Sequence, residues 1–418
     1  MHAMHPSSTL PRAAVLDLYP SKIREVANAG MGRADVLKFW FGEPDRPTAL
    51  AIREAARAAL AAADTFYTHN LGNPELRSAI AGYLSGLHAR PIEPARVAVT
   101  SSGVNALALA HQALAGPGAR VVCVTPVWPN LTEAPKIQGA QVVRVALDFD
   151  SERGWTLDLD RLLDALTPDT ATLVLNSPNN PTGWTITPEQ QAAVLAHCRK
   201  LGIWIVADDV YERVYFGAPK AGGLVTAPSF LDLADAEDRL VSTNSFSKAW
   251  RMTGWRLGWI CAPTAFIEEL GKLIEYNTSC APGFVQAAGL TAIRDSEADI
   301  LADQARYRAA RDHLCARLNA LPGVHAPAAP GAMYAFFRVD GLTDSVAFCK
   351  RLVRDHGLGL APGLAFGPEG EGFIRWCIAA ELATLDQGVD RLAQALAQAR
   401  TENACPDRHN HQRQGHHS

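Results

Sequence analysis

The chain lacks an excess of basic residues, long apolar runs and paired cysteines. Its 418 residues carry 39 Lys and Arg against 43 Asp and Glu, a net charge of −4. We therefore do not expect a nucleic-acid-binding protein, which usually has a basic excess or patch. No run of about 18 apolar residues occurs, so we expect no membrane span. The opening sequence MHAMHPSSTLPR lacks the apolar run of a signal peptide.

Eight cysteines are spread singly along the chain, and none forms a CxxC pair. This spacing indicates neither a zinc site nor a redox motif, and we expect no metal site. A disulfide framework is not expected in a chain of this size. We therefore expect reduced, mostly buried thiols in a cytoplasmic protein.

Short apolar runs alternate with helical patterns between about residues 95 and 262. The runs are rich in Val, Ile and Leu without strict alternation, as buried parallel strands are. They lie at 97–100, 120–125, 172–176, 203–207, 239–244 and 257–262. Helices are expected at 103–115, 158–166 and 188–201, and also at 48–63. Thr187 and Gly202 are suitable caps for the helix at 188–201.

The pattern changes after about residue 295. The expected order is helix 296–320, strand 333–339, helix 344–355, strand 373–379 and helix 382–400. We predict an α/β fold, with a three-layer large domain that has a mostly parallel sheet and a smaller α+β domain. The predicted parts are an N-terminal segment joining the small domain (1–47), the large domain (48–295), the small domain (296–400) and a flexible polar tail (401–418). The tail's histidines are expected to be solvated: His409, His411, His416 and His417.

Polar or aromatic groups follow almost every predicted strand of the large domain. In chain order they are 101–103, Trp128, 176–183, 208–211 and 245–248. In an open parallel sheet, ligands bind outside the carboxyl ends of the strands. These groups should therefore converge on one crevice.

The first of these groups predicts an anion site. Residues 102–104 open a helix, where free backbone N–H groups and the helix dipole favour negative charge. Ser245 and Ser247 can add hydroxyl donors, and Arg256 can add a bidentate clamp suited to phosphate.

The other groups add a reactive amine, an acid and a flat ring. Lys248 lies near a cationic group, which lowers an amine's pKa and makes it nucleophilic. Asp208 follows an apolar strand and would need a cationic partner, and Trp128 offers a stacking face. Taken alone, Lys248 is more simply a surface lysine and Asp208 a helix cap. Together with the anion site, they match what pyridoxal phosphate requires.

Six motifs carry a resemblance to a known family. They are GEPD (42–45), FYTHNLGNPELR (66–77), NSPNNPTG (176–183), DDVY (208–211), SFSKAWRMTGWRLGW (245–259) and IRWCIA (374–379). The chain resembles the class I/II aminotransferases, the pyridoxal-phosphate enzymes of the aspartate aminotransferase fold (fold type I). The resemblance implies a ping-pong transfer of an amino group between an L-amino acid and a 2-oxo acid. It also implies a homodimer with active sites shared between subunits.

The resemblance further implies roles toward the cofactor. Lys248 would be the Schiff-base lysine and general base, and Asp208 would keep the pyridine nitrogen protonated. Tyr211 and Asn180 would hydrogen-bond the 3-oxygen of the cofactor, and Trp128 would stack on its ring. The residues that would hold the phosphate are Ser102, Gly103, Val104, Ser245, Ser247 and Arg256.

Roles toward the substrate and a second subunit follow in the same way. Arg375 would bind the substrate α-carboxylate through two parallel bonds, and Asn180 would also contact the substrate. Gly42 would lie over the substrate as a closing lid. Tyr67 would reach the phosphate of the neighbouring subunit.

Three alternatives stay open at this point. One is a pyridoxal-phosphate-dependent lyase on the same fold, for example a C–S β-eliminating enzyme, because fold does not fix reaction. Another is a cofactor-sensing regulator, although no basic helix-turn-helix precedes the motifs. The third is a binding protein that has lost catalysis, against which the intact Lys248, Asp208 and Arg375 argue.

The chain departs from the family pattern in ways that bear on the substrate. Phe39, Trp40 and Phe41 precede GEPD where small residues are usual, and bulky rings there would narrow the side-chain pocket. Glu275 falls roughly where dicarboxylate-specific members carry an arginine from the partner subunit, which would disfavour acidic donors. Aromatic, aliphatic and sulfur amino acids all remain possible donors.

Overall fold

A seven-stranded sheet forms the centre of the molecule, whose computed structural model describes residues 10–220 and 223–404. The strand order is β2-β10-β9-β8-β7-β3-β4. The strands are β2 (Val97–Thr100), β3 (Arg120–Thr125), β4 (Gln141–Ala146), β7 (Thr170–Asn176), β8 (Trp204–Asp208), β9 (Leu240–Ser245) and β10 (Gly258–Cys261). Neighbours pair in parallel except at β10, which is antiparallel to both β2 and β9. The predicted mostly parallel sheet is confirmed.

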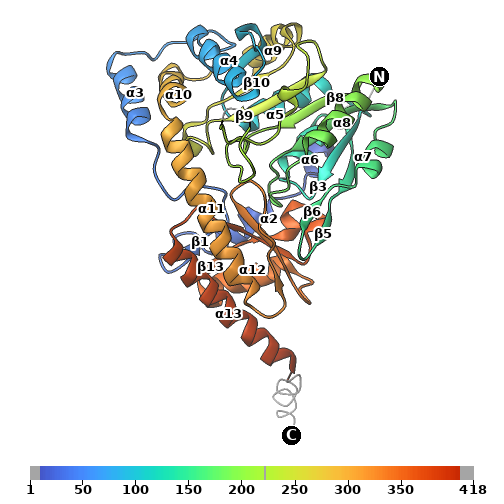
Figure 1. Ribbon diagram of the computed structural model, residues 1–418, viewed down its shortest axis with the longest axis vertical. Helices are drawn as coiled ribbons and strands as arrows, with labels where there is room; N and C mark the ends of the chain where they lie inside the picture. Colours follow the sequence, from blue (N-terminus) through green and yellow to red (C-terminus); the bar gives the residue numbers. More distant parts are fainter. Residues whose placement is uncertain (1–9, 221–222, 405–418) are drawn as a thin grey trace.

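Helices cover both faces of this sheet (Figure 1). They are α4 (Pro74–His88), α5 (Gly103–Leu114), α6 (Asn130–Ile137), α7 (Leu159–Ala165), α8 (Pro188–Leu201), α9 (Thr264–Asn277) and α10 (Gly283–Asp295). A further helix, α3 (Leu50–Ala61), packs on α10 away from the sheet (Figure 1). Two apolar clusters result, one on each face. Val206 of β8 packs with α5 and α9, whereas Ile205 belongs to the cluster that includes α4. Alternate residues of one strand thus supply both cores, which explains the apolar runs without alternation.

A second, four-stranded sheet lies below the first in Figure 1 and is entirely antiparallel. Its order is β11-β12-β15-β14. The strands are β11 (Val324–His325), β12 (Tyr334–Val339), β14 (Ala361–Pro362) and β15 (Phe373–Cys377). Three helices accompany it: α11 (Glu297–Asn319), α12 (Ser345–His356) and α13 (Leu382–Ala404). These elements agree with the predicted order, although the domain limits themselves stay a prediction.

The N-terminal segment packs against this second region. β1 (Leu37–Lys38) pairs in parallel with β13 (Leu358–Gly359), and α2 (Lys22–Ala29) contacts α12. The remaining short elements are α1 (Ala13–Leu16), β5 (Asp148–Asp150) and β6 (Gly154–Thr156). This packing brings residues 20–45 of the chain next to the ends of the central strands.

Two predictions at the helix ends have different outcomes. Thr187 and Gln190 form a capping box at the start of α8, and Gly202 ends it at φ 70°, as predicted. α13 continues to Ala404 and so overlaps the first residues of the predicted tail, whose flexibility stays a prediction. The four histidines predicted to be solvated lie outside the described residues.

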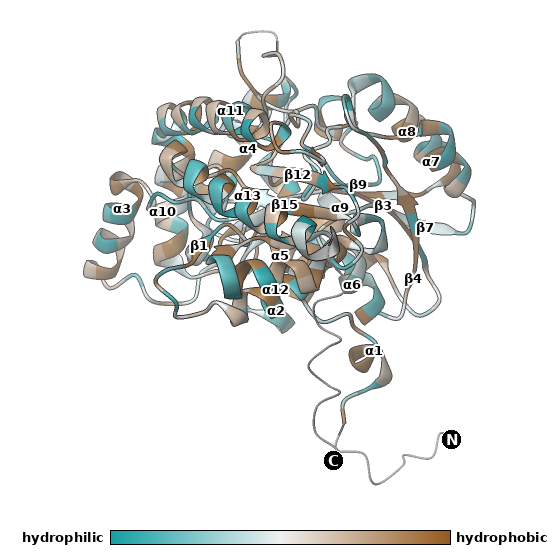
Figure 2. Ribbon diagram, turned by 90° about the horizontal axis from the view of Figure 1, so that it is seen from below, coloured by the Kyte–Doolittle hydropathy of each residue, from teal (hydrophilic) through white to brown (hydrophobic). Residues whose placement is uncertain are grey.

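Hydrophobic residues are concentrated in the central sheet (Figure 2). In Figure 2 the central strands are mostly hydrophobic in colour, whereas the outer helices carry both hydrophilic and hydrophobic stretches. Across the described part of the chain, none of the helices combines the length and the apolar character needed to cross a bilayer.

Candidate active site

The carboxyl ends of the central strands, the start of α5 and the second sheet enclose a cavity of about 390 Å³. All but two of the predicted site residues line it. They are Gly42, Gly103, Val104, Trp128, Asn180, Asp208, Tyr211, Ser245, Ser247, Lys248, Arg256 and Arg375. The convergence expected from the strand ends is therefore observed, with Arg375 added from β15.

Ser102 and Tyr67 do not line the cavity. Ser102 is buried behind it as the N-cap of α5, where its Oγ accepts a hydrogen bond from the Asn105 N–H at 3.0 Å. Tyr67 is 90% exposed. Its predicted contact with a neighbouring subunit stays a prediction.

The start of α5 forms a cradle of hydrogen-bond donors. Gly103 lies so close to β9 that an added Cβ would be 2.9 Å from the Cβ of Ser245. The Ser245 hydroxyl donates to Ser247 Oγ at 2.9 Å. Arg256 reaches the same cavity and donates to the Thr253 carbonyl oxygen at 2.7 Å. Backbone amides, hydroxyls and a guanidinium at one helix start suit an anion such as a phosphate.

Lys248 places a half-buried amine in the cavity. Its Nζ donates to the carbonyl oxygen of Gly42. Removal from water lowers the pKa of this amine to about 8; Cys377 opposes the shift, and the charge of Arg375 adds to it. A lysine with such a pKa is neutral in a large fraction of molecules near pH 8, and a neutral amine is a nucleophile and a base.

Asp208 ends β8 as a buried acid without an ion-pair partner in residues 10–220 and 223–404. Burial raises the pKa of its carboxyl to about 7, and the charge of the adjacent Asp209 adds to the rise. A hydrogen bond from the Val210 N–H acts in the opposite direction. A cationic group of a ligand in the cavity would supply the missing partner.

Tyr334, which sequence reasoning missed, lines the cavity beside Tyr211. Their hydroxyl oxygens are 2.6 Å apart, and burial raises the pKa of both, that of Tyr334 to about 12. The Tyr334 hydroxyl also fills the space above Gly42, where an added Cβ would lie 1.8 Å from it. Position 42 is therefore restricted to glycine. Whether this segment closes over a substrate stays a prediction.

Arg375 is 2% exposed and held in a fixed orientation. Its Nη1 donates to Asn180 Oδ1 at 2.9 Å, and its Nη2 donates to the Trp40 carbonyl oxygen. The guanidinium lies over the rings of Tyr334 and Phe366, at 4.4 and 4.9 Å from their centroids. No carboxylate among the described residues forms an ion pair with it, so its charge is available to a ligand anion.

The remaining lining residues were not predicted as site residues. They are Ile23, Arg24, Phe41, Glu43, Leu107, Asn176, Val210, Thr253 and Tyr334. Asn176 and Glu43 lie inside quoted motifs, so the motifs were the signal that could have found them. Ile23 and Arg24 belong to α2, whose sequence gave no such signal.

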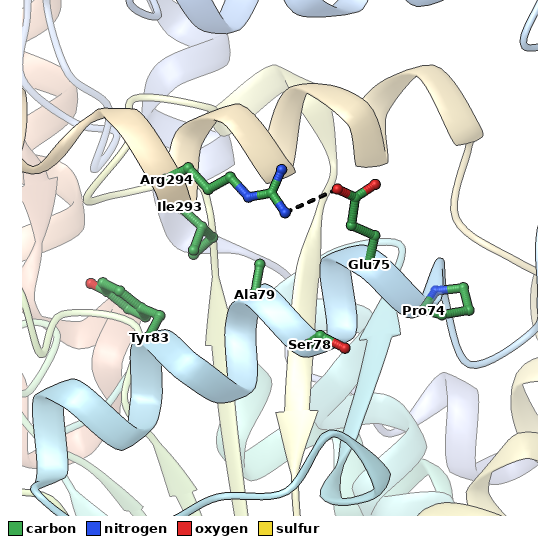
Figure 3. Close-up of a pocket in the computed structure, with 7 residues that line it drawn as sticks. All are labelled: Pro74, Glu75, Ser78, Ala79, Tyr83, Ile293 and Arg294. Carbon is green, nitrogen blue, oxygen red and sulfur yellow. Dashed lines mark hydrogen bonds and ion pairs between the residues drawn. The ribbon is translucent and has the colours of Figure 1, made fainter.

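A different cavity, of about 550 Å³, opens on the outer surface between α4 and α10 (Figure 3). Its charged groups already pair with each other, because Arg294 Nη2 lies 2.9 Å from Glu75 Oε1. The hydroxyl of Tyr83 accepts a hydrogen bond from Arg213 at 2.8 Å. This cavity contains none of the predicted site residues.

Comparison with known proteins agrees with the geometry. Residues 34–393 match the family described as aminotransferase class I and II. The aspartate aminotransferase of Pyrococcus horikoshii is 32% identical over 91% of this chain and 96% of that protein. The aromatic-amino-acid aminotransferase 2 of Thermococcus litoralis is 29% identical over 90% of this chain and 96% of that protein.

A solved structure of a Thermus thermophilus aspartate aminotransferase mutant superposes with a TM-score of 0.85 at 29% identity, covering 93% of this chain and 100% of that one. The lyase alternative gains no support from these relatives. The predicted fold is confirmed, and with the family match over residues 34–393 the chain is a member of the class I and II aminotransferases.

Proposed function

We propose that this aminotransferase holds pyridoxal phosphate in the 390 Å³ cavity, with Lys248 as the Schiff-base lysine. The observation that carries the proposal is the pairing of a half-buried amine of lowered pKa with a buried, unpaired acid in one cavity. Its substrates are an L-amino acid and a 2-oxo acid, as the names of its relatives support.

The donor set fits this cofactor. The phosphate would lie at the start of α5, between Ser245, Ser247 and Arg256. Asp208 would face the ring nitrogen, and its raised pKa favours sharing a proton with that nitrogen. When bound, pyridoxal phosphate supplies an electron sink for negative charge at the substrate α-carbon. Further contacts would come from Tyr211, Asn180 and Trp128.

The chain's own residues do the positioning and the proton transfer. Arg375 would bind the substrate α-carboxylate, because its fork is fixed by Asn180 and Trp40 and has no carboxylate of its own in the described part of the chain. Lys248 Nζ would accept the proton from the substrate α-carbon. Its pKa of about 8 keeps the amine able both to take up and to release that proton.

Borohydride reduction followed by peptide mass mapping tests the proposal. The cofactor label should appear on Lys248 of the wild-type protein. The variant Lys248→Ala should carry no label and should lose several orders of magnitude in turnover, since nucleophile and base are both removed. Label on another lysine, or near-normal turnover of the variant, would overturn the assignment. Release of pyruvate and ammonia without a 2-oxo acid would indicate a lyase.

We also propose a homodimer in the cytoplasm. Tyr67 supports the dimer, because its exposed ring is free to reach a neighbouring subunit. The free thiols at the described positions support a reducing compartment. Light scattering tests the first proposal, and cell fractionation tests the second.

A further inference from the structure

A buried acid and a buried histidine on the α4 side of the central sheet each have one polar atom without a partner. Glu212 Oε2 and His88 Nε2 form no hydrogen bond with any of the described residues. The two atoms lie 3.6 Å apart, and the side chains are 3% and 0% exposed. Unsatisfied polar atoms are costly in such a place, so the two need a common explanation.

The other ring nitrogen of His88 fixes where its proton can be. Nδ1 lies 2.8 Å from Oδ1 of Asp232, the last residue of η2 (Phe230–Asp232). Burial alone would raise the pKa of Asp232, but hydrogen bonds with His88 and Lys220 hold it below the ordinary value. An ionised carboxylate only accepts, so Nδ1 carries a hydrogen and Nε2 is the nitrogen that gains or loses one.

One proton satisfies both unpartnered atoms. With no proton, a carboxylate oxygen faces the lone pair of Nε2, and with two protons an O–H faces an N–H. A single proton on either atom places a donor opposite an acceptor. The two groups therefore titrate as a pair, in which burial raises the pKa of Glu212 and the charge of His88 opposes the rise. The titratable and charged groups around the pair are Tyr83, Asp209, Arg213, Lys220, Asp232 and Cys261.

The second oxygen of Glu212 connects the pair to the donor cradle at the start of α5. Glu212 Oε1 accepts a hydrogen bond from Asn244 Nδ2 at 2.7 Å, and Asn244 Oδ1 accepts one from the Ser245 N–H at 2.7 Å. A backbone N–H can only donate, so the amide is held in one orientation. The packing is tight here, because a Cβ added at Gly258 would lie 2.7 Å from Asn244 O and 2.6 Å from Gly103 N. A shift of Asn244 would therefore move the amides of the cradle.

We propose that Glu212 is a positioning residue for the cofactor phosphate, acting through Asn244 and sharing one proton with His88. The inference rests on the proposed function for one point, that a phosphate lies in the cradle. Glu212 does not line the cavity itself. Its carboxyl fixes the residue directly before Ser245, and the shared proton keeps a negative charge from forming behind the phosphate.

Paired affinities of pyridoxal phosphate and pyridoxal measure the cradle separately from the rest of the site. The two aldehydes differ only in the phosphate, so the ratio of their dissociation constants defines a phosphate preference for each variant. Absorbance titration of the cofactor-free protein gives both constants. In Glu212→Ala the preference should fall about 10-fold, because Asn244 loses the acceptor that fixes it, while pyridoxal should bind within about 2-fold of the wild type. Equal losses for both aldehydes would overturn the proposal.

Glu212→Gln tests the shared proton and keeps the proposal testable if the alanine variant does not fold. Glutamine offers an oxygen to Asn244 and an NH2 group to His88 Nε2, so the preference should return to within about 3-fold of the wild type at neutral pH. Above the ionisation of the phosphate itself at about pH 6, the wild-type preference should fall with rising pH, because the pair loses its proton. The glutamine variant should stay level. Equal pH profiles in the two proteins would overturn the proposal.

Asp209→Asn is the matched control. Asp209 is as buried as Glu212 and lies on the same face, but its hydrogen-bonded oxygen contacts Ser242 and Ser229 rather than Asn244. This variant should leave the phosphate preference unchanged. A loss as large as that in Glu212→Ala would mean that any change in these buried acids weakens the cradle, and Glu212 would have no specific role.

Inorganic phosphate separates a failure of this inference from a failure of the proposed function. Its binding to the cofactor-free protein needs the cradle but not Lys248, and calorimetry measures it. Binding that is about 10-fold weaker in Glu212→Ala than in Asp209→Asn supports the role of Glu212 even if borohydride places no label on Lys248. Equal phosphate binding by the wild type and Glu212→Ala overturns that role even if Lys248 carries the label.

Discussion

Asp208 and Asp209 are neighbours in the chain but serve opposite faces of the seven-stranded sheet. Asp208 faces the cavity at the start of α5 and has no ion-pair partner in the described part of the chain. Asp209 faces the α4 side, where its Oδ2 accepts hydrogen bonds from Ser242 at 2.6 Å and Ser229 at 3.2 Å. Burial raises the pKa of both carboxyls.

The rest of the α4 side follows the same rule as Asp209. Glu212 accepts a hydrogen bond from Asn244 at 2.7 Å, and His88 pairs with Asp232 at 2.8 Å. Equal burial therefore has two different consequences. Asp209 and Glu212 on the α4 side accept hydrogen bonds from the protein, although one carboxylate oxygen of Glu212 has no hydrogen-bond partner among the described residues. Asp208 on the cavity side has no ion-pair partner in the same part of the chain and is left for a ligand.

The largest expected effect comes from Asp208→Asn. Turnover should fall by about 10³-fold or more, because an amide cannot hold a proton on the ring nitrogen. The free energy of unfolding of the cofactor-free protein should rise by about 2 kcal/mol at pH 8. This is less than the ~4 kcal/mol that the full pKa shift represents, because the amide still needs hydrogen-bond partners. Denaturant titration and steady-state kinetics measure the two effects.

The pH dependence provides the control for this variant. A carboxyl whose pKa rises from 3.8 to about 7 on folding binds more protons in the folded state between those values. The contribution of Asp208 to wild-type stability should therefore fall as the pH rises from about 4 to 7, and the advantage of Asp208→Asn over the wild type should grow over the same interval and then level off. A variant less stable than the wild type at pH 8 would show that the protein itself compensates this charge.

Arg375→Lys tests whether the cavity cations are reserved for ligand anions. Lysine keeps the charge but not the fork held between Asn180 and Trp40. Binding of amino acids should weaken by about 2 kcal/mol, roughly 30-fold in apparent affinity. The concentration dependence of the half-reaction measures this. Unchanged affinity would mean that Arg375 serves the fold rather than the substrate.

Tyr334→Phe also changes a residue of the cavity, and its effect should be smaller than that of Arg375→Lys. Phenylalanine keeps the ring under the Arg375 guanidinium but removes the hydroxyl that lies 2.6 Å from that of Tyr211. One neutral hydrogen bond contributes about 1 kcal/mol, so kcat/KM should fall about 5-fold. Steady-state kinetics at saturating cofactor measure this. A fall as large as that of Arg375→Lys would mean that the hydroxyl contacts the substrate directly.

Most residues that line the cavity could be predicted from the sequence, because they follow strands whose apolar runs are unambiguous. Strands buried on both faces give continuous Val, Ile and Leu, as in β7 and β8. β4 was missed because it is the edge strand and half-exposed, so its signal is weaker. The amino-acid composition of β10 does not reveal that this strand runs antiparallel to its neighbours.

Residues brought in from distant segments could not be found in this way. Tyr334 was placed on a predicted strand, but nothing in the strand pattern says that its hydroxyl meets Tyr211, more than 100 residues away. Arg24 and Phe41 join the cavity only because the N-terminal segment packs on the second region through β1 and α2. The hydrogen-bond partners that distinguish Asp209 from Asp208 also come from distant parts of the chain. The local sequence DDVY therefore does not show which of the two acids has partners.

Asp209→Asn is the matched counterpart of Asp208→Asn and has the smallest expected effect on activity. The amide keeps one oxygen for Ser242 and Ser229 but places an NH2 group where the other carboxylate oxygen lies, and a buried donor without an acceptor is costly. The free energy of unfolding should fall by about 1 kcal/mol, while kcat/KM should stay within about 3-fold, because the side chain faces away from the cavity. The same denaturant titrations and kinetics apply to both variants. If Asp209→Asn lost activity as Asp208→Asn does while keeping its stability, the α4 side would belong to the catalytic machinery, and hydrogen-bond satisfaction would no longer distinguish the two acids.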